Sequence, residues 1–585
     1  MGWLVLVGLQ WAFAWVYACG VIDPPRNAVI KVTSGAGQSV GYERFGVMTH
    51  FAQGWNPDWI PLIKAAVVPQ VRDELYWNQV ELQKGVFKFP ASFDTYMAAL
   101  KQNQISPLIV LSFENPLYDG GNTPYTQEGF DGYAQYAVEV LRHYGSQVKA
   151  VEIWNEYNGS FNHGPAAADR AVTYVKMLRA AYAAIKRERP DVTVVGGSTA
   201  GVPLPYWEKI MTAGGLDFMD ALSIHPYRYG LPPEGIEDDV AGLQRLVLQY
   251  NHGLTKPIWV SEIGWYIKAS LAAGDLAIDE NVQAKFLVRA YALLLSANVS
   301  EVYWYLFRDS QDSMGLVHDD ATRTRKPAYS AMSTLIQQVA GAHFVRREET
   351  LDDLYSLLFQ RSNGDEVRIV WALSPHPLTL TGATAAAAID GGPVAIQPQL
   401  TIADSPVFVS GPLRGLPPAP AKLILLADST RDFGAATDGA WSYGTFADSK
   451  TTFAALPTYE LTDWKAEWTG GFPYVSITSV DQHPSSANGL PVTAVRRWRS
   501  NYEGVVQVGG SFRCSTQGDG VGVGFAVDGV VRFRTVLGGG AGVVQAFDRQ
   551  ETVHPGTIFD FTVDPGPSTN IDYDATAVSI TIQAK

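Results

Sequence analysis

The stretch VKAVEIWNE, residues 148–156, joins a short apolar run to a cluster of polar residues. Val148–Ile153 is rich in apolar and β-branched residues and predicts a buried strand, which ends at Trp154, Asn155 and Glu156. Further apolar runs of the same kind predict strands at Phe45–Met48, Val67–Val71, Ser106–Ser112, Val192–Val195, Ala221–Ile224, Pro257–Val260 and Glu301–Tyr305. The opening stretch is therefore one member of a repeating pattern.

Longer segments of helical composition separate these strands, for example Phe130–Tyr144, Ala166–Arg187 and Asn281–Ala297. Strands that alternate with helices predict parallel pairing through crossover connections. About 36 residues per strand–helix unit is an ordinary size for a (β/α)8 barrel. We therefore predict an α/β fold, with a TIM barrel over residues 23–338.

After Gln338 the chain changes to short strands separated by Gly, Asn, Asp and Pro. Residues 339–413 predict a small antiparallel β domain, residues 414–421 a Pro-rich linker, and residues 422–585 a β-sandwich of the jelly-roll kind. In the small domain we expect strands at Tyr355–Phe359, Glu366–Trp371, Leu378–Leu380 and Val407–Val409. In the sandwich we expect them at Gly504–Phe512, Val521–Phe525, Val530–Val536, Ile558–Val563 and Ala577–Ile582.

The first 22 residues carry no charged side chain, and Trp3–Ala18 is almost wholly apolar. Such a segment is typical of a secretory signal. Val16–Cys19 resembles a bacterial lipoprotein processing site, with Cys19 as the lipidated residue; a plain signal peptide and an uncleaved anchor are the alternatives. Each alternative predicts a secreted or extracytoplasmic protein whose membrane attachment, if any, is through this segment.

Composition excludes several classes of protein. The 585 residues carry a formal net charge of −14 and no cluster of Lys and Arg, so we expect no nucleic-acid partner. Cys19 and Cys514 are the two cysteines, which excludes a disulfide framework and a Cys-x-x-Cys redox or zinc motif. Aromatic residues make up 12% of the chain, and we expect most in the core and some as flat platforms for a ligand. The oligomeric state is not predicted.

Glu156 and Glu262 both stand where a predicted strand ends. They are 106 residues apart, which is about three units, so strands four and seven bring them to the same mouth of the barrel. Paired carboxylates at one mouth are the apparatus of glycoside hydrolysis. Metal ligands or a structural ion pair are the alternatives; no His stands near either residue at metal-ligand spacing, and we expect no metal or cofactor.

Trp154-Asn155-Glu156, followed by the strand-end Glu262, resembles the clan A retaining glycoside hydrolases, the 4/7 barrel superfamily. The resemblance extends over about residues 44–338. It implies that Glu156 is the catalytic acid/base and Glu262 the nucleophile. It also implies that Asn155 bonds the 2-hydroxyl of the sugar.

Other strand ends extend the resemblance. Arg72 is similar to the clan's strand-two arginine, which keeps the nucleophile ionised. His225 and Tyr227 end strand six, where the clan often places a His or Tyr against the nucleophile. Trp304 resembles the strand-eight tryptophan that floors the −1 subsite. With the run Arg72-Asp-Glu-Leu75 and the attached β domain, the chain is most like family 39 or family-39-like polysaccharide hydrolases, and family 5 is a close competitor.

Some residues near strand ends fit either a substrate contact or simple packing: His50, Trp77, Trp265, Tyr266, Glu114 and Asn115. His50 would line the −1 site, and the aromatic residues would be sugar platforms. We expect Asp309 and Asp312 in a solvated loop. Glu152 shares the face of Glu156 but lies about 13 Å deeper in the strand, so we expect it in a structural ion pair.

The resemblance implies a double displacement that retains configuration, with carboxyl groups about 5–5.5 Å apart, Glu156 protonated and Glu262 ionised. We expect endo action on a polysaccharide or oligosaccharide, because the C-terminal module, with Trp441-Ser-Tyr-Gly444, looks like a carbohydrate-binding domain. A non-catalytic surface protein that binds carbohydrate and a transglycosidase with the same residues are the alternatives. The identity of the sugar is not predicted.

Overall fold

The computed structural model describes residues 41–228, 231–267, 278–310, 313–348, 353–396, 399–413, 424–435, 440–447, 452–463, 465–514, 520–538, 543–566, 570–572 and 574–584. The predicted signal segment with Cys19 and the predicted linker 414–421 lie outside these residues. Among the helices of the described residues, none is both long enough and apolar enough to cross a membrane. The chain divides into two compact units at residues 419 and 420.

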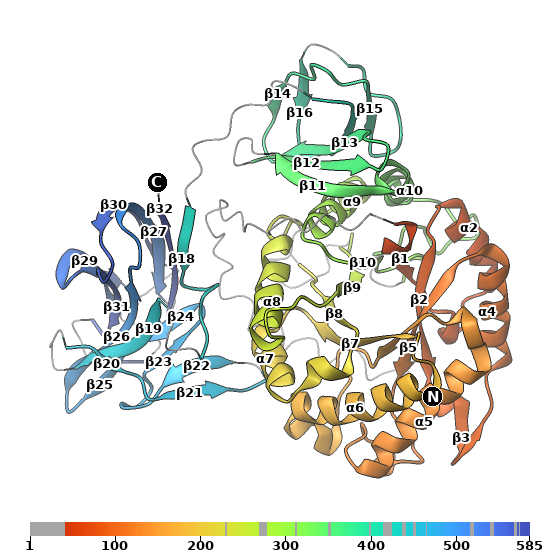
Figure 1. Cartoon of the computed structure of the whole chain (residues 1–585), viewed down its shortest axis with the longest axis horizontal. Coiled ribbons are helices and arrows are strands. Elements are labelled where there is room, and N and C mark those ends of the chain that lie inside the picture. Colours follow the sequence, from red (N-terminus) through yellow and green to blue (C-terminus); the bar gives the residue numbers. More distant parts are fainter. Residues whose placement is uncertain are drawn as a thin grey trace. The chain divides into compact units, whose positions relative to one another are not determined.

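A closed barrel of eight parallel strands forms most of the first unit (Figure 1). In the order in which they pair around the barrel, the strands are β1 (Phe45–Met48), β10 (Glu301–Trp304), β9 (Ile258–Ile263), β8 (Ala221–His225), β7 (Thr193–Ala200), β6 (Ala150–Ile153), β5 (Ser106–Ser112) and β2 (Gln70–Tyr76). A two-stranded hairpin, β3 (Glu81–Gln83) and β4 (Val86–Phe87), follows β2.

Two strands differ from the prediction in a way that matters for the site. The second strand runs over Gln70–Tyr76 and not over Val67–Val71, because Val67 has a left-handed φ of 54° and turns the chain. The strand then continues through Arg72, which is fully buried yet paired. A buried charge is tolerated in a strand only when it has such a partner. The seventh strand likewise extends to Ile263 and includes Glu262.

Helices surround the barrel (Figure 1). They are α2 (Ile60–Ala65), α3 (Trp77–Val80), α4 (Ala91–Asn103), α5 (Gln127–Tyr144), α6 (Arg170–Glu188), α7 (Leu204–Thr212), α8 (Ile236–Tyr250), α9 (Glu280–Ser296) and α10 (Pro327–Val339). The residues directly before α5, α6 and α9 are Thr126, Asp169 and Asp279, and each side chain accepts a hydrogen bond from the backbone N–H three residues further on. Such caps satisfy an amide that the first helical turn leaves unpaired.

The region after α10 forms an antiparallel sheet whose strands pair in the order β11 (Ala342–Glu348), β12 (Leu354–Arg361), β13 (Glu366–Ala372), β17 (Val407–Ser410) and β15 (Ala385–Ala388), together with the pair β14 (His376–Leu378) and β16 (Leu400–Ile402). Side chains of this sheet, among them Trp371 and Phe408, belong to the same apolar core as the barrel. The Trp371 indole also donates to Glu234 in the barrel at 2.9 Å. The sheet and the barrel thus share one compact unit.

The second unit is built from two antiparallel sheets. One contains β21 (Thr458–Leu461), β22 (Ala466–Thr469), β23 (Ser476–Thr478), β24 (Asp481–His483), β32 (Thr576–Ala584), β27 (Gly504–Cys514), β30 (Val544–Val553) and β18 (Ile424–Asp428). The other contains β20 (Ala454–Ala455), β19 (Trp441–Ala447), β26 (Leu490–Arg499), β31 (Ile558–Asp564), β28 (Gly520–Val527), β29 (Val530–Gly538) and β25 (Ser485–Ala487). Rings such as Phe525 and Phe561, stacked at 4.9 Å, lie in its core. The parallel barrel and the β-sandwich confirm the predicted fold class.

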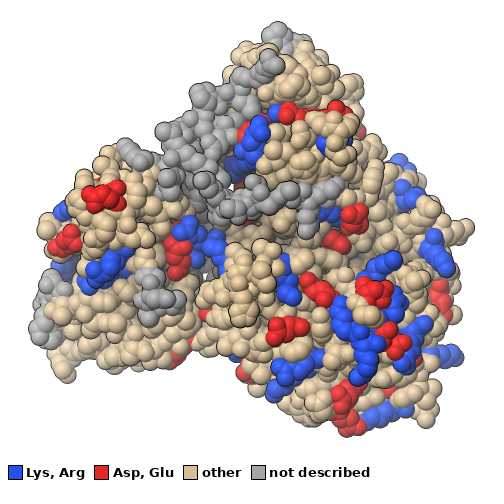
Figure 2. Space-filling view, viewed as in Figure 1, with Lys and Arg blue, Asp and Glu red and all other residues tan. Residues whose placement is uncertain are grey.

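Charged side chains on the face shown in Figure 2 are interspersed, with Lys and Arg beside Asp and Glu over the barrel. Several are paired, for example Arg142 on α5 with Glu139 and Glu188, both at 2.8 Å. Mixed charge of this kind is an ordinary solvated surface.

Candidate active site

Glu156 lies just beyond β6, in a tight turn at the carboxyl end of the barrel. Both Trp154 and Glu156 have left-handed φ angles, 69° and 46°. Such angles are strained for residues other than glycine and persist only where the surroundings impose them. Here the Glu156 N–H donates to the Ser198 carbonyl and the Gly159 N–H donates to the Glu156 carbonyl, both at 2.7 Å. The side chain of Glu156 is 20% exposed, so the turn presents its carboxylate at the mouth.

Glu262 stands in β9, the seventh barrel strand in chain order, and His225 is the last residue of β8. One oxygen of Glu156, one oxygen of Glu262 and one ring nitrogen of His225 lie within 4.8 Å of one another. The structure therefore brings the two strand-end carboxylates together across the mouth, with an imidazole between them.

The Glu262 carboxylate is held in its ionised form. Arg72 Nη1 lies 2.5 Å from Oε1, and the Tyr227 hydroxyl donates to Oε2 at 2.8 Å. Burial alone raises the pKa of Glu262, but the charges of His225 and Arg72 and these hydrogen bonds outweigh it and hold the pKa below its ordinary value. A carboxylate kept ionised next to a second carboxylate is suited to act as a nucleophile.

Arg72 is fully buried and connects three side chains. Beside Glu262, its Nε donates to Glu152 at 2.6 Å and its Nη2 donates to the Asn155 side-chain oxygen at 2.7 Å. Glu152 is itself fully buried, in the structural ion pair expected from its depth. Because the Asn155 oxygen accepts from Arg72, its NH2 group is the part of the amide left to face a ligand.

His225 is fully buried and contacts both sides of the site. Its Nδ1 lies 2.9 Å from Glu156 Oε1 and 3.8 Å from Glu262 Oε2. Its Nε2 lies 2.9 Å from the Ser261 hydroxyl and 3.2 Å from that of Ser198. Burial lowers the pKa of His225, but the negative charge of Glu262 and the hydrogen bond and charge of Glu156 raise it by more, so the net shift is upward.

His50, after β1, lies on the other side of the mouth. Its Nε2 is 3.4 Å from the Tyr305 hydroxyl, and the Tyr305 ring is 6.3 Å from that of Tyr227. The expectation that Trp304 floors the −1 subsite is wrong. Trp304 is fully buried, and its indole donates to the Met314 carbonyl at 3.0 Å. The next residue, Tyr305, is half-buried at the mouth, because neighbouring residues of a strand face opposite ways.

Two other aromatic candidates are core residues and not platforms. Trp77 is fully buried, stacks on Tyr118 at 4.8 Å and donates to Glu81 at 2.6 Å. Trp265 is 3% exposed, stacks on Trp304 at 6.0 Å and donates to the Leu231 carbonyl. Because both indoles are buried among other rings, neither offers an open face to a sugar. Tyr266 is half-buried against the core.

Of the polar candidates after strands three and eight, Asn115 and Asp309 are buried and paired, whereas Glu114 is partly exposed. Asn115 is buried and bonds the carbonyls of Trp77 and Glu81, so its role is structural. Glu114 stays partly exposed, 3.5 Å from His163. Asp309 is not in a solvated loop: it is 9% exposed and pairs with the buried Lys326 at 2.5 Å. Asp312 lies outside the described residues.

Glu156, His225 and Glu262 together are also a donor set that a divalent ion can use. Both Glu262 oxygens, however, already accept hydrogen bonds, from Arg72 and Tyr227, and His225 Nδ1 is already bonded to Glu156. A guanidinium against a ligand carboxylate opposes the charge of a cation. The arrangement therefore fits acid–base chemistry better than a metal centre.

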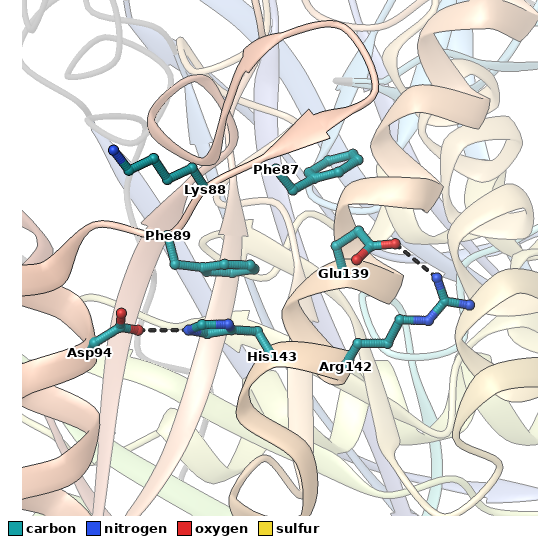
Figure 3. Close-up of a pocket in the computed structure, with 7 residues that line it drawn as sticks. All are labelled: Phe87, Lys88, Phe89, Asp94, Glu139, Arg142 and His143. Atoms are coloured by element: carbon teal, nitrogen blue, oxygen red, sulfur yellow. Dashed lines mark hydrogen bonds and ion pairs between the residues drawn. The ribbon is translucent and has the colours of Figure 1, made fainter.

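A shallow depression elsewhere on the barrel, of about 510 Å³, lies against α4 and α5 (Figure 3). Four of its polar groups pair with one another: Asp94 with His143 and Glu139 with Arg142, both at 2.8 Å. Phe89 stacks on the His143 ring at 3.9 Å. Neither Glu156 nor Glu262 lines this depression, so it is not part of the candidate active site.

Two aromatic residues near the mouth, Phe113 and Phe161, are not among the site residues predicted from the sequence. Phe113 directly follows β5, and Phe161 lies in the turn that carries Glu156. Phe113 directly follows the predicted strand Ser106–Ser112, so its place at a strand end is a signal that the sequence carries. Phe161 had no sequence signal, because a turn residue shows its exposure only in three dimensions.

No protein-family model matches the chain, and no curated protein matches it. Solved structures do. A family 39 glycoside hydrolase from Bacteroides cellulosilyticus is 22% identical with a TM-score of 0.55, over 64% of this chain and 81% of its own. A conserved exported protein from Bacteroides fragilis is 12% identical with a TM-score of 0.50, over 64% of this chain and 98% of its own. At these identities the likeness establishes the fold, a barrel that a known glycoside hydrolase shares.

Proposed function

We propose that the protein is a retaining glycoside hydrolase that cleaves β-glycosidic bonds of a polysaccharide by double displacement. The observation that carries the proposal is the approach of the Glu156 and Glu262 carboxylate oxygens to within 4.8 Å. Retaining enzymes hold their carboxyl groups about 5–5.5 Å apart, whereas inverting enzymes need about 6.5–9.5 Å to admit a water. The likeness to the family 39 enzyme agrees with the proposal.

In the first step Glu262 attacks the anomeric carbon while Glu156 gives a proton to the leaving oxygen. Arg72 and Tyr227 favour this role for Glu262, because both stabilise its ionised form. The Asn155 NH2 group is placed to donate to the sugar 2-hydroxyl, a contact that strengthens in the transition state.

In the second step Glu156 removes a proton from water, and the water releases the sugar from Glu262 with its original configuration. His225 lies between the two carboxylates and bonds Glu156, so it orients the acid/base as that residue loses and regains a proton. All of these proton transfers use side chains of this chain.

The test compares Glu262→Gln and Glu156→Ala on β-linked polysaccharides and aryl β-glycosides. We expect Glu262→Gln to abolish turnover, and Glu156→Ala to spare substrates whose leaving group needs no proton. Glu301→Gln is the matched control, since Glu301 begins β10 at the opposite end of the barrel. Normal turnover by Glu262→Gln, or a product of inverted configuration, would refute the proposal.

Endo action, secretion and carbohydrate binding by the C-terminal unit are finer parts of this proposal. Their support is the apolar amino-terminal sequence and a β-sandwich beyond the barrel. Removing residues from 420 onward tests the last of them by measuring co-sedimentation with insoluble polysaccharide. Unchanged co-sedimentation would contradict a binding role for this unit.

A further inference from the structure

Three aromatic side chains line the carboxyl ends of three adjacent barrel strands. Tyr76 is the last residue of β2, Phe113 follows β5, and Phe161 lies in the turn after β6. The Tyr76 and Phe113 rings are 6.1 Å apart, and the Phe113 and Phe161 rings are 5.3 Å apart and parallel within 2°. Because β2, β5 and β6 are neighbours in the barrel, these rings form a continuous row along one side of the mouth.

Phe161 is the exposed end of this row. It is 40% exposed, whereas Phe113 and Tyr76 are half-buried. One face of the Phe161 ring rests on Phe113, so the opposite face is the one open to solvent. A single exposed ring is common on protein surfaces and carries no argument by itself. The argument comes from how the ring is fixed and from what stands beside it.

The backbone of Phe161 is held by a buried anchor. The indole of Trp154, which is fully buried, donates to the Phe161 carbonyl at 3.2 Å, and its ring meets Phe113 edge-on at 5.4 Å. Asn158, in the same turn, exchanges two hydrogen bonds with the backbone of Ala200 at 3.0 and 3.1 Å. A platform fixed before a ligand arrives loses little conformational entropy on binding.

The row stands beside the group proposed to protonate the leaving oxygen. Phe161 follows Glu156 in a segment of two successive turns, closed by hydrogen bonds from the Gly159 N–H to the Glu156 carbonyl and from the Asn162 N–H to the Gly159 carbonyl. The acid meets the substrate on the side of the departing sugar. Glu114 and His163, 3.5 Å apart and 29% and 47% exposed, follow Phe113 and Phe161 in sequence. They offer an acceptor and a donor to sugar hydroxyls at the edge of the platform.

We propose that Phe161, supported by Phe113, is a leaving-group subsite that binds the apolar face of an uncharged sugar ring, with Glu114 and His163 at its rim. This inference rests on the proposed function and deepens it, because it names the side chains that bind the sugar on the leaving side of the bond being cut. A flat ring with C–H groups on one face and hydroxyls at its edge matches a flat aromatic ring bordered by polar groups.

The test measures kcat/KM of wild type, Phe161→Ala and Phe161→Trp on β-linked hexasaccharides of xylose, mannose and glucose. It also measures the glycosyl fluorides of the same sugars, whose leaving group is too small to reach the platform. We expect Phe161→Ala to lower the ratio of hexasaccharide to fluoride kcat/KM about tenfold, mainly through KM, and Phe161→Trp to restore it.

Tyr42→Ala is the matched control, since Tyr42 is 55% exposed and precedes β1 at the other end of the barrel. If Phe161→Ala does not fold, Phe161→Leu replaces it, because leucine keeps apolar volume but has no flat face. An unchanged ratio in these variants would overturn the subsite while leaving the proposed function intact. A wild type that hydrolyses neither substrate class would instead overturn the proposed function.

Discussion

Replacing Arg72 by methionine tests whether the ion network under the site holds the barrel together. Arg72 is fully buried and reaches Glu152 at 2.6 Å, Glu262 at 2.5 Å and Asn155 at 2.7 Å. Methionine has a similar apolar length but no charge. The substitution therefore leaves two carboxylates, at most 9% exposed, without their shared cation.

Breaking a buried ion pair from one side costs about 3–5 kcal/mol, because the remaining charge is buried without compensation. We expect Arg72→Met to lower the free energy of unfolding by about 5 kcal/mol, because two carboxylates lose their partner. Glu152 Oε1 has no hydrogen-bond partner among the described residues that could compensate. Adding Glu152→Gln removes one of the stranded charges and should recover about 2 kcal/mol of the free energy of unfolding.

The loss should also depend on pH. Without Arg72, burial raises the folded-state pKa of Glu262 above its unfolded value, so folding takes up protons. Stability of Arg72→Met is then highest below the unfolded pKa and falls as the pH rises through the folded pKa. The loss of unfolding free energy relative to wild type should therefore become smaller as the pH is lowered from 8 to 5.

The assay is urea unfolding followed by hydrogen-exchange mass spectrometry on peptides from β2 and β6, which reports the barrel separately from the C-terminal unit. Arg142→Met is the control, because Arg142 pairs on the surface of α5 and its loss should leave the barrel midpoint close to wild type. A deficit below about 1 kcal/mol, the value of an exposed pair, would refute the reasoning. So would a deficit that is equal at pH 5 and pH 8.

Two further predictions concern the chemistry of the site. Tyr227→Phe removes a 2.8 Å hydrogen bond that favours ionised Glu262, so the acid limb of kcat/KM should move up by about one pH unit; an unmoved limb contradicts the contact. EDTA should leave turnover unchanged, because the proposed acid–base chemistry of Glu156 and Glu262 needs no metal ion. Added Zn²⁺ should inhibit, because Glu156, His225 and Glu262 can bind it and are then no longer available for catalysis. A requirement for a divalent ion would contradict acid–base catalysis.

Much of the barrel could be predicted from local pattern. The run Ser106–Ser112 is apolar from Pro107 to Leu111 because a parallel strand is buried on both faces, and β5 has the predicted bounds. The prediction for the second strand stopped at Val71, where the charges begin. Hydropathy cannot show that Arg72 and Glu152, 80 residues apart, neutralise each other inside the barrel.

At the mouth of the barrel, too, the sequence predicts some side chains of the site and leaves others undecided. Counting strand ends placed Glu156 and Glu262 at one mouth, because the carboxyl ends of parallel strands all point the same way. It could not separate Trp304 from Tyr305. A difference of one residue turns a side chain from the core to the cleft, and the pairing register that decides it is a property of the neighbouring strands.

The sequence by itself determined the alternation of strands and helices, and with it the barrel and the pair of glutamates, since both follow from local periodicity and spacing. Only the tertiary structure decided which aromatic rings are core and which meet solvent. Trp77 is covered by Tyr118, from the segment before α5, and by Tyr136, from α5 itself. Phe161, in contrast, is covered on one face by Phe113 and stays partly exposed. Burial depends on which distant segments pack against a side chain, and that information is absent from any single stretch of sequence.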